Sequence, residues 1–227
     1  MKILVINPNT TASMTHKIAA AARKVARPDT EIIAVNSQNG PASIQGFLDV
    51  ATCVPGLLEE ITRHPDVDAI VIACFDDTGL DAVRTMFDVP VLGIGEAAYH
   101  AASMIATKFS VITTLSRSVP GIENNLLRYG LAQKCGRVRA TDIPVLKLEE
   151  GDPETLHKIR SEIRSAIAQD SAEAIVLGCA GMVDLISQLS EEFGLPVIDG
   201  VTAGVNFAEA LVNSRLRTSK IGAYSAQ

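Results

Sequence analysis

Short apolar runs alternate with longer segments of helical period along the chain. The runs are rich in β-branched residues and are bounded by Pro, Gly, Asn or Asp, which is typical of buried strands. In the segments between them, apolar residues recur every three or four positions, which predicts amphipathic helices. Because uninterrupted apolar strands that alternate with helices form parallel sheets covered on both faces, the pattern predicts an α/β fold. Strands are expected at residues 2–7, 31–35, 69–74, 90–94, 108–113, 137–142, 174–178 and 196–198, and helices at 11–26, 47–63, 79–87, 96–106, 117–129, 153–169, 181–193 and 201–214.

The chain also repeats its pattern at a nearly constant offset. Three pairs of segments match at 105 or 106 residues, which predicts two similar lobes related by a pseudo-twofold axis, each with a four-stranded, mainly parallel sheet. The first lobe is expected at residues 1–106 and the second at 107–200. The last helix and tail, 201–227, precede no further strand and are expected to pack back onto the first lobe. The matching pairs are "KILVINPNT" from Lys2 and "KFSVITTLS" from Lys108, "AIVIAC" from Ala69 and "AIVLGC" from Ala174, and "VPVLGIGEAA" from Val89 and "LPVIDGVTAG" from Leu195.

Composition excludes several classes of function. The 227 residues suffice for one large domain or two small ones. A formal net charge of −6 and scattered Lys and Arg residues give no basic surface for a phosphate backbone, so nucleic acid is not an expected partner. The N-terminal apolar run is too short for a signal peptide, and no later run reaches the roughly 20 apolar residues of a membrane span. The chain is therefore expected in the cytoplasm, without a membrane partner.

Cysteine is the residue type whose placement points to chemistry. The four cysteines form no C-x-x-C pair and the four histidines are isolated in sequence, so no metal site is expected. Cys74 and Cys179 are 105 residues apart, and each follows the equivalent strand of its lobe. Because ligands bind beyond the carboxyl ends of parallel strands, both thiols are expected to face one ligand from opposite sides. Cys53 and Cys135 have no counterpart in the other lobe and are expected to be small buried hydrophobes.

Two thiols on opposite sides of one carbon atom are suited to racemisation or epimerisation without a cofactor. Such a reaction needs one deprotonated and one protonated group, and a helix N-terminus is expected to lower a thiol pKa from about 8.5 toward neutrality. Backbone N–H groups after each cysteine are expected to hold the enolate-like charge that forms. At the first turn of each lobe, side-chain hydrogen bonds are expected from Asn9, Thr10, Thr113 and Thr114.

Three neighbouring features have plainer interpretations. Asp76 and Asp77 are expected to cap the helix that follows them, because Asp is favoured at and just after the N-cap. The stretch "GIGEAA", residues 93–98, fits the dinucleotide pattern G-x-G-x-x-G/A only formally, because Glu96 would lie where the pyrophosphate binds. The stretch "GPASIQG", residues 40–46, is expected to be a connecting loop and is also a candidate lid.

Taken together, these segments resemble the aspartate/glutamate/hydantoin racemase superfamily, and within it the hydantoin racemases. The resemblance extends over most of the chain and rests on several motifs in order. The matching motifs are "INPNT" at 6–10, "GPASIQG" at 40–46, "ACFDDTGLDAVR" at 73–84, "VITTLSRSVP" at 111–120 and "LGCAGM" at 177–182.

The resemblance implies a fold of two α/β lobes with the active site between them. It implies cofactor-independent racemisation of 5-monosubstituted hydantoins, with Cys74 and Cys179 as the catalytic acid/base residues, each serving one enantiomer. It also implies a homo-oligomer. The substrate-binding residues implied in the same way are Asn9, Ser43, Ile44, Phe75, Thr114, Ala180 and Gly181.

Two departures from the superfamily pattern bear on the substrate. Free amino-acid racemases of the superfamily usually carry Asn or Thr after each cysteine, where this chain has Phe75 and Ala180. This difference favours a neutral ring with an apolar 5-substituent over aspartate or glutamate. Gln45 stands where many relatives carry Glu, which bears on recognition of the ring.

Alternative functions remain open at this point. Allantoin racemisation is the nearest, because allantoin is a 5-substituted hydantoin with a polar ureido group. Maleate isomerisation on the same scaffold uses two cysteines, whereas arylmalonate decarboxylation typically uses one and is disfavoured by the pair. From another class, the two lobes would form a non-catalytic small-molecule binder with cysteines that only pack, or a redox switch that closes a Cys74–Cys179 disulfide.

Overall fold

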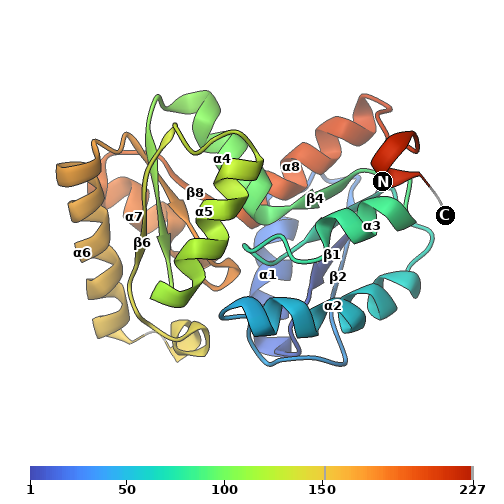
Figure 1. Ribbon diagram of the computed structural model, residues 1–227, viewed down its shortest axis with the longest axis horizontal. Coiled ribbons are helices and arrows are strands. Elements are labelled where there is room, and N and C mark those ends of the chain that lie inside the picture. The colour runs from blue at the N-terminus through green and yellow to red at the C-terminus, as the bar shows by residue number, and fades with distance from the viewer. Residues whose placement is uncertain (151, 226–227) are drawn as a thin grey trace.

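The protein consists of two parallel sheets flanked by helices, as the computed structural model of residues 1–150 and 152–225 shows (Figure 1). Each sheet has four strands, in the orders β2-β1-β3-β4 and β6-β5-β7-β8, so the second half repeats the topology of the first. The predicted α/β class and duplicated sheets are confirmed. The strands are β1 (Lys2–Asn7), β2 (Glu31–Asn36), β3 (Ala69–Ile72), β4 (Val91–Gly93), β5 (Phe109–Thr113), β6 (Cys135–Ala140), β7 (Ala174–Leu177) and β8 (Val197–Asp199).

Helices connect consecutive strands as the apolar period predicts, with local differences. The expected helix at 181–193 is split, because Gly181 and the β-branched Val183 weaken α-helix formation and residues 180–185 form a 3₁₀ turn. β6 begins at Cys135, two residues earlier than expected. It is an edge strand whose first residues are largely exposed, so the apolar pattern does not mark its start. The helices are α1 (Ala12–Val25), α2 (Phe47–Thr62), α3 (Leu80–Met86), α4 (Ile94–Ile105), α5 (Val119–Arg128), α6 (Pro153–Asp170), α7 (Ile186–Phe193) and α8 (Gly200–Asn213), with 3₁₀ turns η1 (Ser116–Ser118), η2 (Val145–Glu150), η3 (Ala180–Leu185) and η4 (Gly222–Tyr224).

The two halves exchange their last helices. α4 packs on β7 and β8 of the second sheet, where Tyr99 and Ala102 are buried in one cluster with Phe109. α8 packs on β3 and β4 of the first sheet and buries Val205 beside Val71 (Figure 1). Each sheet therefore completes its apolar cover with a helix from the other half of the sequence.

The starts of the two exchanged helices touch each other. A Cβ atom on Gly200, the first residue of α8, would lie 2.2 Å from the carbonyl oxygen of Ile94, the first residue of α4. A glycine is therefore required at this approach. The contact fixes the two sheets relative to each other and, with them, the ends of their central strands.

No helix within the described residues, 1–150 and 152–225, has the length and apolar content needed to cross a membrane.

Candidate active site

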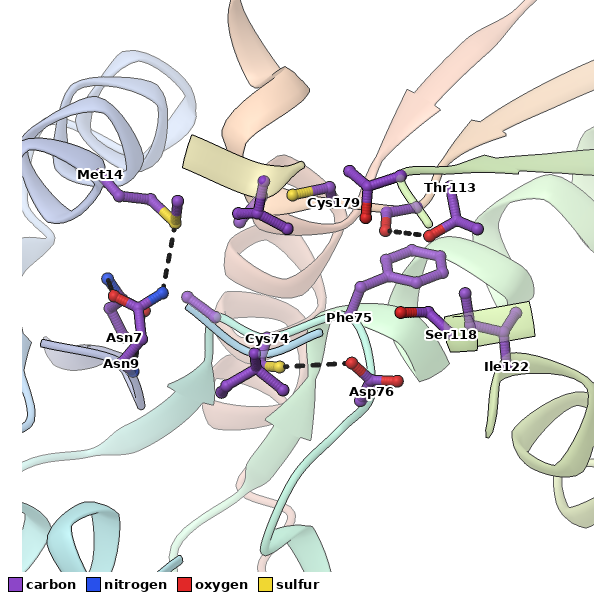
Figure 2. A pocket seen from close by; sticks show the side chains of 16 residues that line it. Asn7, Asn9, Met14, Cys74, Phe75, Asp76, Thr113, Ser118, Ile122 and Cys179 are labelled. Atoms are coloured by element: carbon purple, nitrogen blue, oxygen red, sulfur yellow. Dashed lines mark hydrogen bonds between the residues drawn. The ribbon is translucent and has the colours of Figure 1, made fainter. Parts of the chain in front are cut away.

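A small cavity lies where the carboxyl ends of the central strands of both sheets meet. Its volume is about 40 Å³, and residues from both halves line it. Cys74 follows β3 and Cys179 follows β7, and Figure 2 shows them on opposite sides of the pocket. The lining residues are Asn7, Asn9, Met14, Ile44, Ala73, Cys74, Phe75, Asp76, Thr113, Thr114, Ser118, Ile122, Val145, Gly178, Cys179 and Ala180.

Most of the binding residues expected from the sequence lie in this cavity. Asn9, Ile44, Phe75, Thr114 and Ala180 line it together with both cysteines.

Ser43 and Gly181 do not line the cavity, and neither does Thr10. Ser43 is buried and accepts a hydrogen bond of 2.5 Å from Gln45 Nε2. Gly181 instead directs its backbone N–H at the Cys179 sulfur. Thr10 is tied to the 40–46 loop, because its backbone N–H donates to the Pro41 carbonyl oxygen at 3.1 Å.

The Cys74 thiol lies in a buried position with two oxygen neighbours. Its Sγ atom is 3.6 Å from Thr78 Oγ1. The same Sγ atom is 4.0 Å from Asp76 Oδ2 (Figure 2). Burial raises the pKa of Cys74 well above its ordinary value, and the charge of Asp76 raises this pKa further. Hydrogen bonds from Thr78 and from the Asp76 backbone oppose the rise. At neutral pH, Cys74 is therefore a protonated thiol.

The Cys179 thiol is also held in its protonated form. Burial raises the pKa of Cys179 to about 11, against the opposing hydrogen bond from the Gly181 backbone. The expectation that a helix N-terminus lowers a thiol pKa toward neutrality is therefore wrong, because both pKa values are raised. The physical reason is that loss of water outweighs the few N–H groups available, since α3 begins only at Leu80 and Cys179 is followed by a 3₁₀ turn.

Asp77 caps a helix, but not the one that the sequence predicts. Its Oδ1 and Oδ2 atoms each accept a 2.8 Å hydrogen bond, from the backbone N–H groups of Gly95 and Glu96 at the start of α4. Tyr129 OH also donates to Oδ2 at 2.8 Å, and burial raises the pKa of Asp77 to about 7. α3 is capped by Gly79 instead, in a left-handed conformation with φ of 74°.

Asp76 is not a cap and lines the cavity beside Cys74. Burial raises the pKa of Asp76 to about 6. The predicted capping role for Asp76 is therefore wrong. The signal in the sequence was ambiguous, because a carboxylate after a strand suits both a helix N-cap and a cleft at the strand end.

Two N–H groups of the "GIGEAA" stretch that a phosphate would need are already occupied. The stretch forms the start of α4, and the Gly95 and Glu96 N–H groups donate hydrogen bonds to the Asp77 carboxylate. The Glu96 carboxylate is paired with Arg84 at 2.6 Å. The dinucleotide pattern is thus a coincidence of composition. Among the described residues there is also no group of three or more His, Cys, Asp or Glu side chains arranged to hold a metal ion.

Several lining residues were not identified from the sequence. Asn7 ends β1, and its Nδ2 atom donates to Asn9 Oδ1 at 2.9 Å, which orients the Asn9 side chain. Asn9 Nδ2 in turn donates to Met14 Sδ at 3.4 Å. The duplication carried a signal for Asn7, because Asn7 and Thr113 end equivalent strands. Ser118 lies within the motif "VITTLSRSVP" but was not singled out, and Val145 comes from a 3₁₀ turn that no motif marks.

A second cavity opens next to the first and is called the outer chamber here. Its volume is about 170 Å³, and it shares Asp76 and Ser118 with the cysteine cavity. Its other walls combine the apolar Phe47 and Val50 with polar groups of η1 and α5. The lining residues are Gly46, Phe47, Val50, Asp76, Arg117, Ser118, Gly121, Asn124 and Asn125. A group attached to a ligand in the first cavity has room to extend here.

Comparisons with known proteins agree with this geometry. A family described as Asp/Glu/Hydantoin racemase matches residues 3–208. The chain is 47% identical to a hydantoin racemase of Pseudomonas sp. (strain NS671) over 99% of this chain and 91% of that protein. It is 50% identical to a hydantoin racemase of Rhizobium meliloti over 99% of this chain and 94% of that protein.

Solved structures give the same relationship. An allantoin racemase from Klebsiella pneumoniae superposes with a TM-score of 0.97 at 46% identity, covering 100% of this chain and 94% of that chain. An allantoin racemase from Pseudomonas fluorescens superposes with a TM-score of 0.97 at 41% identity, covering 100% and 97%. These neighbours share the two-lobed arrangement of paired sheets.

Proposed function

The chain belongs to the Asp/Glu/Hydantoin racemase family and is a racemase, and from this premise we propose that it racemises 5-monosubstituted hydantoins without a cofactor. Cys74 and Cys179 exchange the proton on C5 of the ring, each from one face. The observation that carries the proposal is that two cysteines at equivalent positions of the two halves line one cavity from opposite sides (Figure 2).

The hydantoin ring suits a pair of thiols. Its C5 hydrogen lies next to a carbonyl group, so the electrons released at C5 delocalise into an enolate. A thiolate on one face removes the proton, and a thiol on the other face returns one to give the opposite configuration. The side chains of Asn9, Thr114 and Ser118 line the cavity and offer hydrogen-bond donors for the enolate oxygen.

The cavity walls favour a neutral ring. Phe75 and Ala180, which follow the two cysteines, are joined by Ile44 and Val145 as apolar lining residues. A free amino acid would bring a carboxylate and an ammonium group into this space, where their desolvation is costly. The relatives described as hydantoin racemases support the same substrate class.

Allantoin is the second candidate substrate, and the outer chamber is the observation that favours it. Arg117, Asn124 and Asn125 offer hydrogen-bond donors to a ureido group on C5, whereas Phe47 and Val50 suit an alkyl or aryl group. The similarity to two allantoin racemases of known structure supports this candidate as well. Comparing kcat/KM for allantoin with that for 5-isopropylhydantoin decides between the two.

The first prediction concerns the two cysteines. Cys74→Ala and Cys179→Ala are each expected to abolish racemisation while retaining exchange of the C5 hydrogen with deuterated water for one enantiomer only. The reason is that each variant keeps one acid/base group on one face. Exchange is followed by proton NMR on each pure enantiomer of a 5-alkylhydantoin.

The matched control is Cys135→Ala, which removes a thiol outside the cavity. This variant is expected to keep the parent rate. Racemisation at the parent rate by either Cys74→Ala or Cys179→Ala would disprove the two-base assignment.

A further inference from the structure

The cavity contains one carboxylate that the two-thiol scheme leaves without a role. Asp76 Oδ2 accepts from the Cys74 thiol at 4.0 Å, and the side chain lies on the boundary between the cysteine cavity and the outer chamber. No Lys, Arg or His of residues 1–150 and 152–225 forms an ion pair with it, and burial alone raises its pKa. A carboxylate so placed is in direct contact with a reacting sulfur atom (Figure 2).

The carboxylate breaks the pseudo-twofold symmetry of the site. The residue that corresponds to Asp76 at the offset of the cysteines is Gly181, which offers Cys179 only a backbone N–H. Cys74 therefore has a carboxylate acceptor at contact distance, and no described residue offers one to Cys179. The difference matters because both thiols are protonated at neutral pH, and a thiol cannot remove a proton from carbon.

Resting on the racemisation proposed above, we propose that the Asp76 carboxylate carries the negative charge of the resting site and is the base that removes the Cys74 proton once substrate is bound. Asp76 is then a third catalytic residue, and the site works as a triad of one carboxylate and two thiols. The Cys74 thiolate exists only during turnover.

Protons and charge balance in this scheme. The Cys74 S–H bond breaks with its electron pair left on sulfur, and the proton forms an O–H bond on Asp76. The thiolate removes the C5 proton, and the C5–H electron pair passes into the ring enolate. The Cys179 thiol then protonates the opposite face of C5 and becomes the thiolate. One negative charge is conserved, first on Asp76 and finally on Cys179.

The reverse direction begins from the form of the site that the forward direction leaves, in which Cys179 is the thiolate. An enantiomer of the opposite hand meets the Cys179 thiolate while Asp76 is protonated, and the steps run backward. Between turnovers, solvent returns the proton from Asp76 to Cys179. Thr78 assists both directions, because its hydroxyl is 3.6 Å from Cys74 Sγ and donates to the transient thiolate.

Other groups face Asp76 from each neighbouring element. Cys53 of α2 and Tyr99 of α4 both have a pKa raised chiefly by burial and additionally by the charge of Asp76. Cys179 faces it from the second half, and Arg117 of η1 lines the outer chamber with it. Cys53, Tyr99 and Cys179 are neutral at pH 7, so Asp76 is the member of this set that ionises just below neutrality.

The activity test compares the parent chain with Asp76→Asn and Asp76→Glu between pH 5 and pH 10, using racemisation of a 5-alkylhydantoin. For the parent chain, kcat/KM is expected to rise with pH through a limb near the pKa of Asp76, about 6. Asp76→Asn is expected to lose at least about 100-fold at pH 7 and to recover as the thiols themselves ionise. Asp76→Glu keeps a carboxylate and is expected to keep the limb below pH 7.

A second measurement, the rate of Cys74 alkylation, is expected to rise in the variant whose racemisation falls. It distinguishes a catalytic role of Asp76 from a structural one. Because the charge of Asp76 raises the pKa of Cys74, Asp76→Asn is expected to let iodoacetamide alkylate Cys74 several-fold faster at pH 8. Peptide mass spectrometry distinguishes Cys74 from the other thiols. A purely structural effect would speed alkylation of the partly buried Cys135 as well, whereas loss of the Asp76 charge is expected to leave Cys135 unchanged.

Each possible result supports or overturns the proposal. An Asp76→Asn variant that keeps the parent pH profile, or an unchanged rate of Cys74 alkylation, overturns it. If Asp76→Asn does not fold, the parent chain alone still decides, because a rising limb above pH 9 would show that a thiol supplies the base. Failure of the parent chain to racemise hydantoins would contradict the proposed function instead, and the alkylation comparison would then still test the pairing of Asp76 with Cys74.

Discussion

At the residue scale, the site is governed by the cost of placing thiols away from water. The sequence identified both cysteines, because the duplication places them at the ends of equivalent strands. It did not give their protonation state, since this depends on burial by residues distant in the chain, such as Ile44 and Val145. The carboxylate at Asp76 was visible, but its direction was not, because a local pattern cannot distinguish a cap from a cavity wall.

The Thr78 hydroxyl gives a prediction at this scale. Thr78→Val keeps the shape of the side chain but removes the hydroxyl 3.6 Å from Cys74 Sγ. A hydrogen bond to a charged group contributes about 1.5–3 kcal/mol, so kcat/KM for racemisation at pH 8 is expected to fall by roughly 10-fold or more. The rate of Cys74 alkylation is expected to fall with it, because the Thr78 hydrogen bond lowers the Cys74 pKa.

The control for Thr78→Val is Thr52→Val on the exposed surface of α2, whose hydroxyl bonds only the α2 backbone. Thr52→Val is expected to leave both rates unchanged. If Thr78→Val matched this control, the hydroxyl would have no part in stabilising the thiolate.

At the element scale, the loop after β3 connects the catalytic chemistry to the exchanged helices. Cys74 and Asp76 face the cavity, while the next residue, Asp77, caps α4, which packs on the other sheet. Sequence patterns predicted α4 as a helix but not its partner, because periodicity shows that a helix has an apolar face and not which sheet covers it. The cap across the two halves was therefore inaccessible to local reasoning.

Substitution of Tyr129 tests this cap. Tyr129 directly follows α5, and its hydroxyl donates to the Asp77 carboxylate at 2.8 Å. The pKa of Asp77 is raised to about 7, so the carboxyl is neutral at pH 5 and ionised at pH 9. The Tyr129 hydrogen bond favours the ionised form, and its loss therefore matters more above pH 7 than below it. Tyr129→Phe is expected to lower the free energy of unfolding by about 1 kcal/mol at pH 5 and about 2 kcal/mol at pH 9, measured by urea titration.

Tyr224→Phe is the matched control, since Tyr224 donates to the more exposed Asp81 at 2.8 Å. Its effect is expected to stay below about 0.5 kcal/mol at both pH values. An effect of Tyr129→Phe that is equal at pH 5 and pH 9 would argue against an Asp77 carboxyl that titrates between them.

At the scale of the whole molecule, the duplication predicted the two sheets, their parallel strands and a shared site. The pattern of 105 or 106 residues contained this information because each half retains the same strand order. What it could not contain is the pairing of surfaces between the halves. That pairing depends on side-chain shape in three dimensions, as at Gly200, where only the absence of a Cβ lets α8 approach α4.

The exchange of α4 and α8 predicts that the two sheets unfold together. Val205 of α8 is fully buried against the first sheet, and α8 also contacts α4, which covers the second sheet. Val205→Ala removes two methyl groups from this junction and is expected to cost roughly 2 kcal/mol. Native-state hydrogen exchange is then expected to show the same loss of protection for β3 and β7 amides, because neither sheet retains its cover when the helices separate.

Ala210→Gly, on the less buried side of α8, serves as a control for helix propensity and is expected to cost about 1 kcal/mol. Loss of protection confined to β3 would mean that the halves unfold independently. The packing of α8 against α4 would then hold the cavity between Cys74 and Cys179 together less strongly than these contacts indicate.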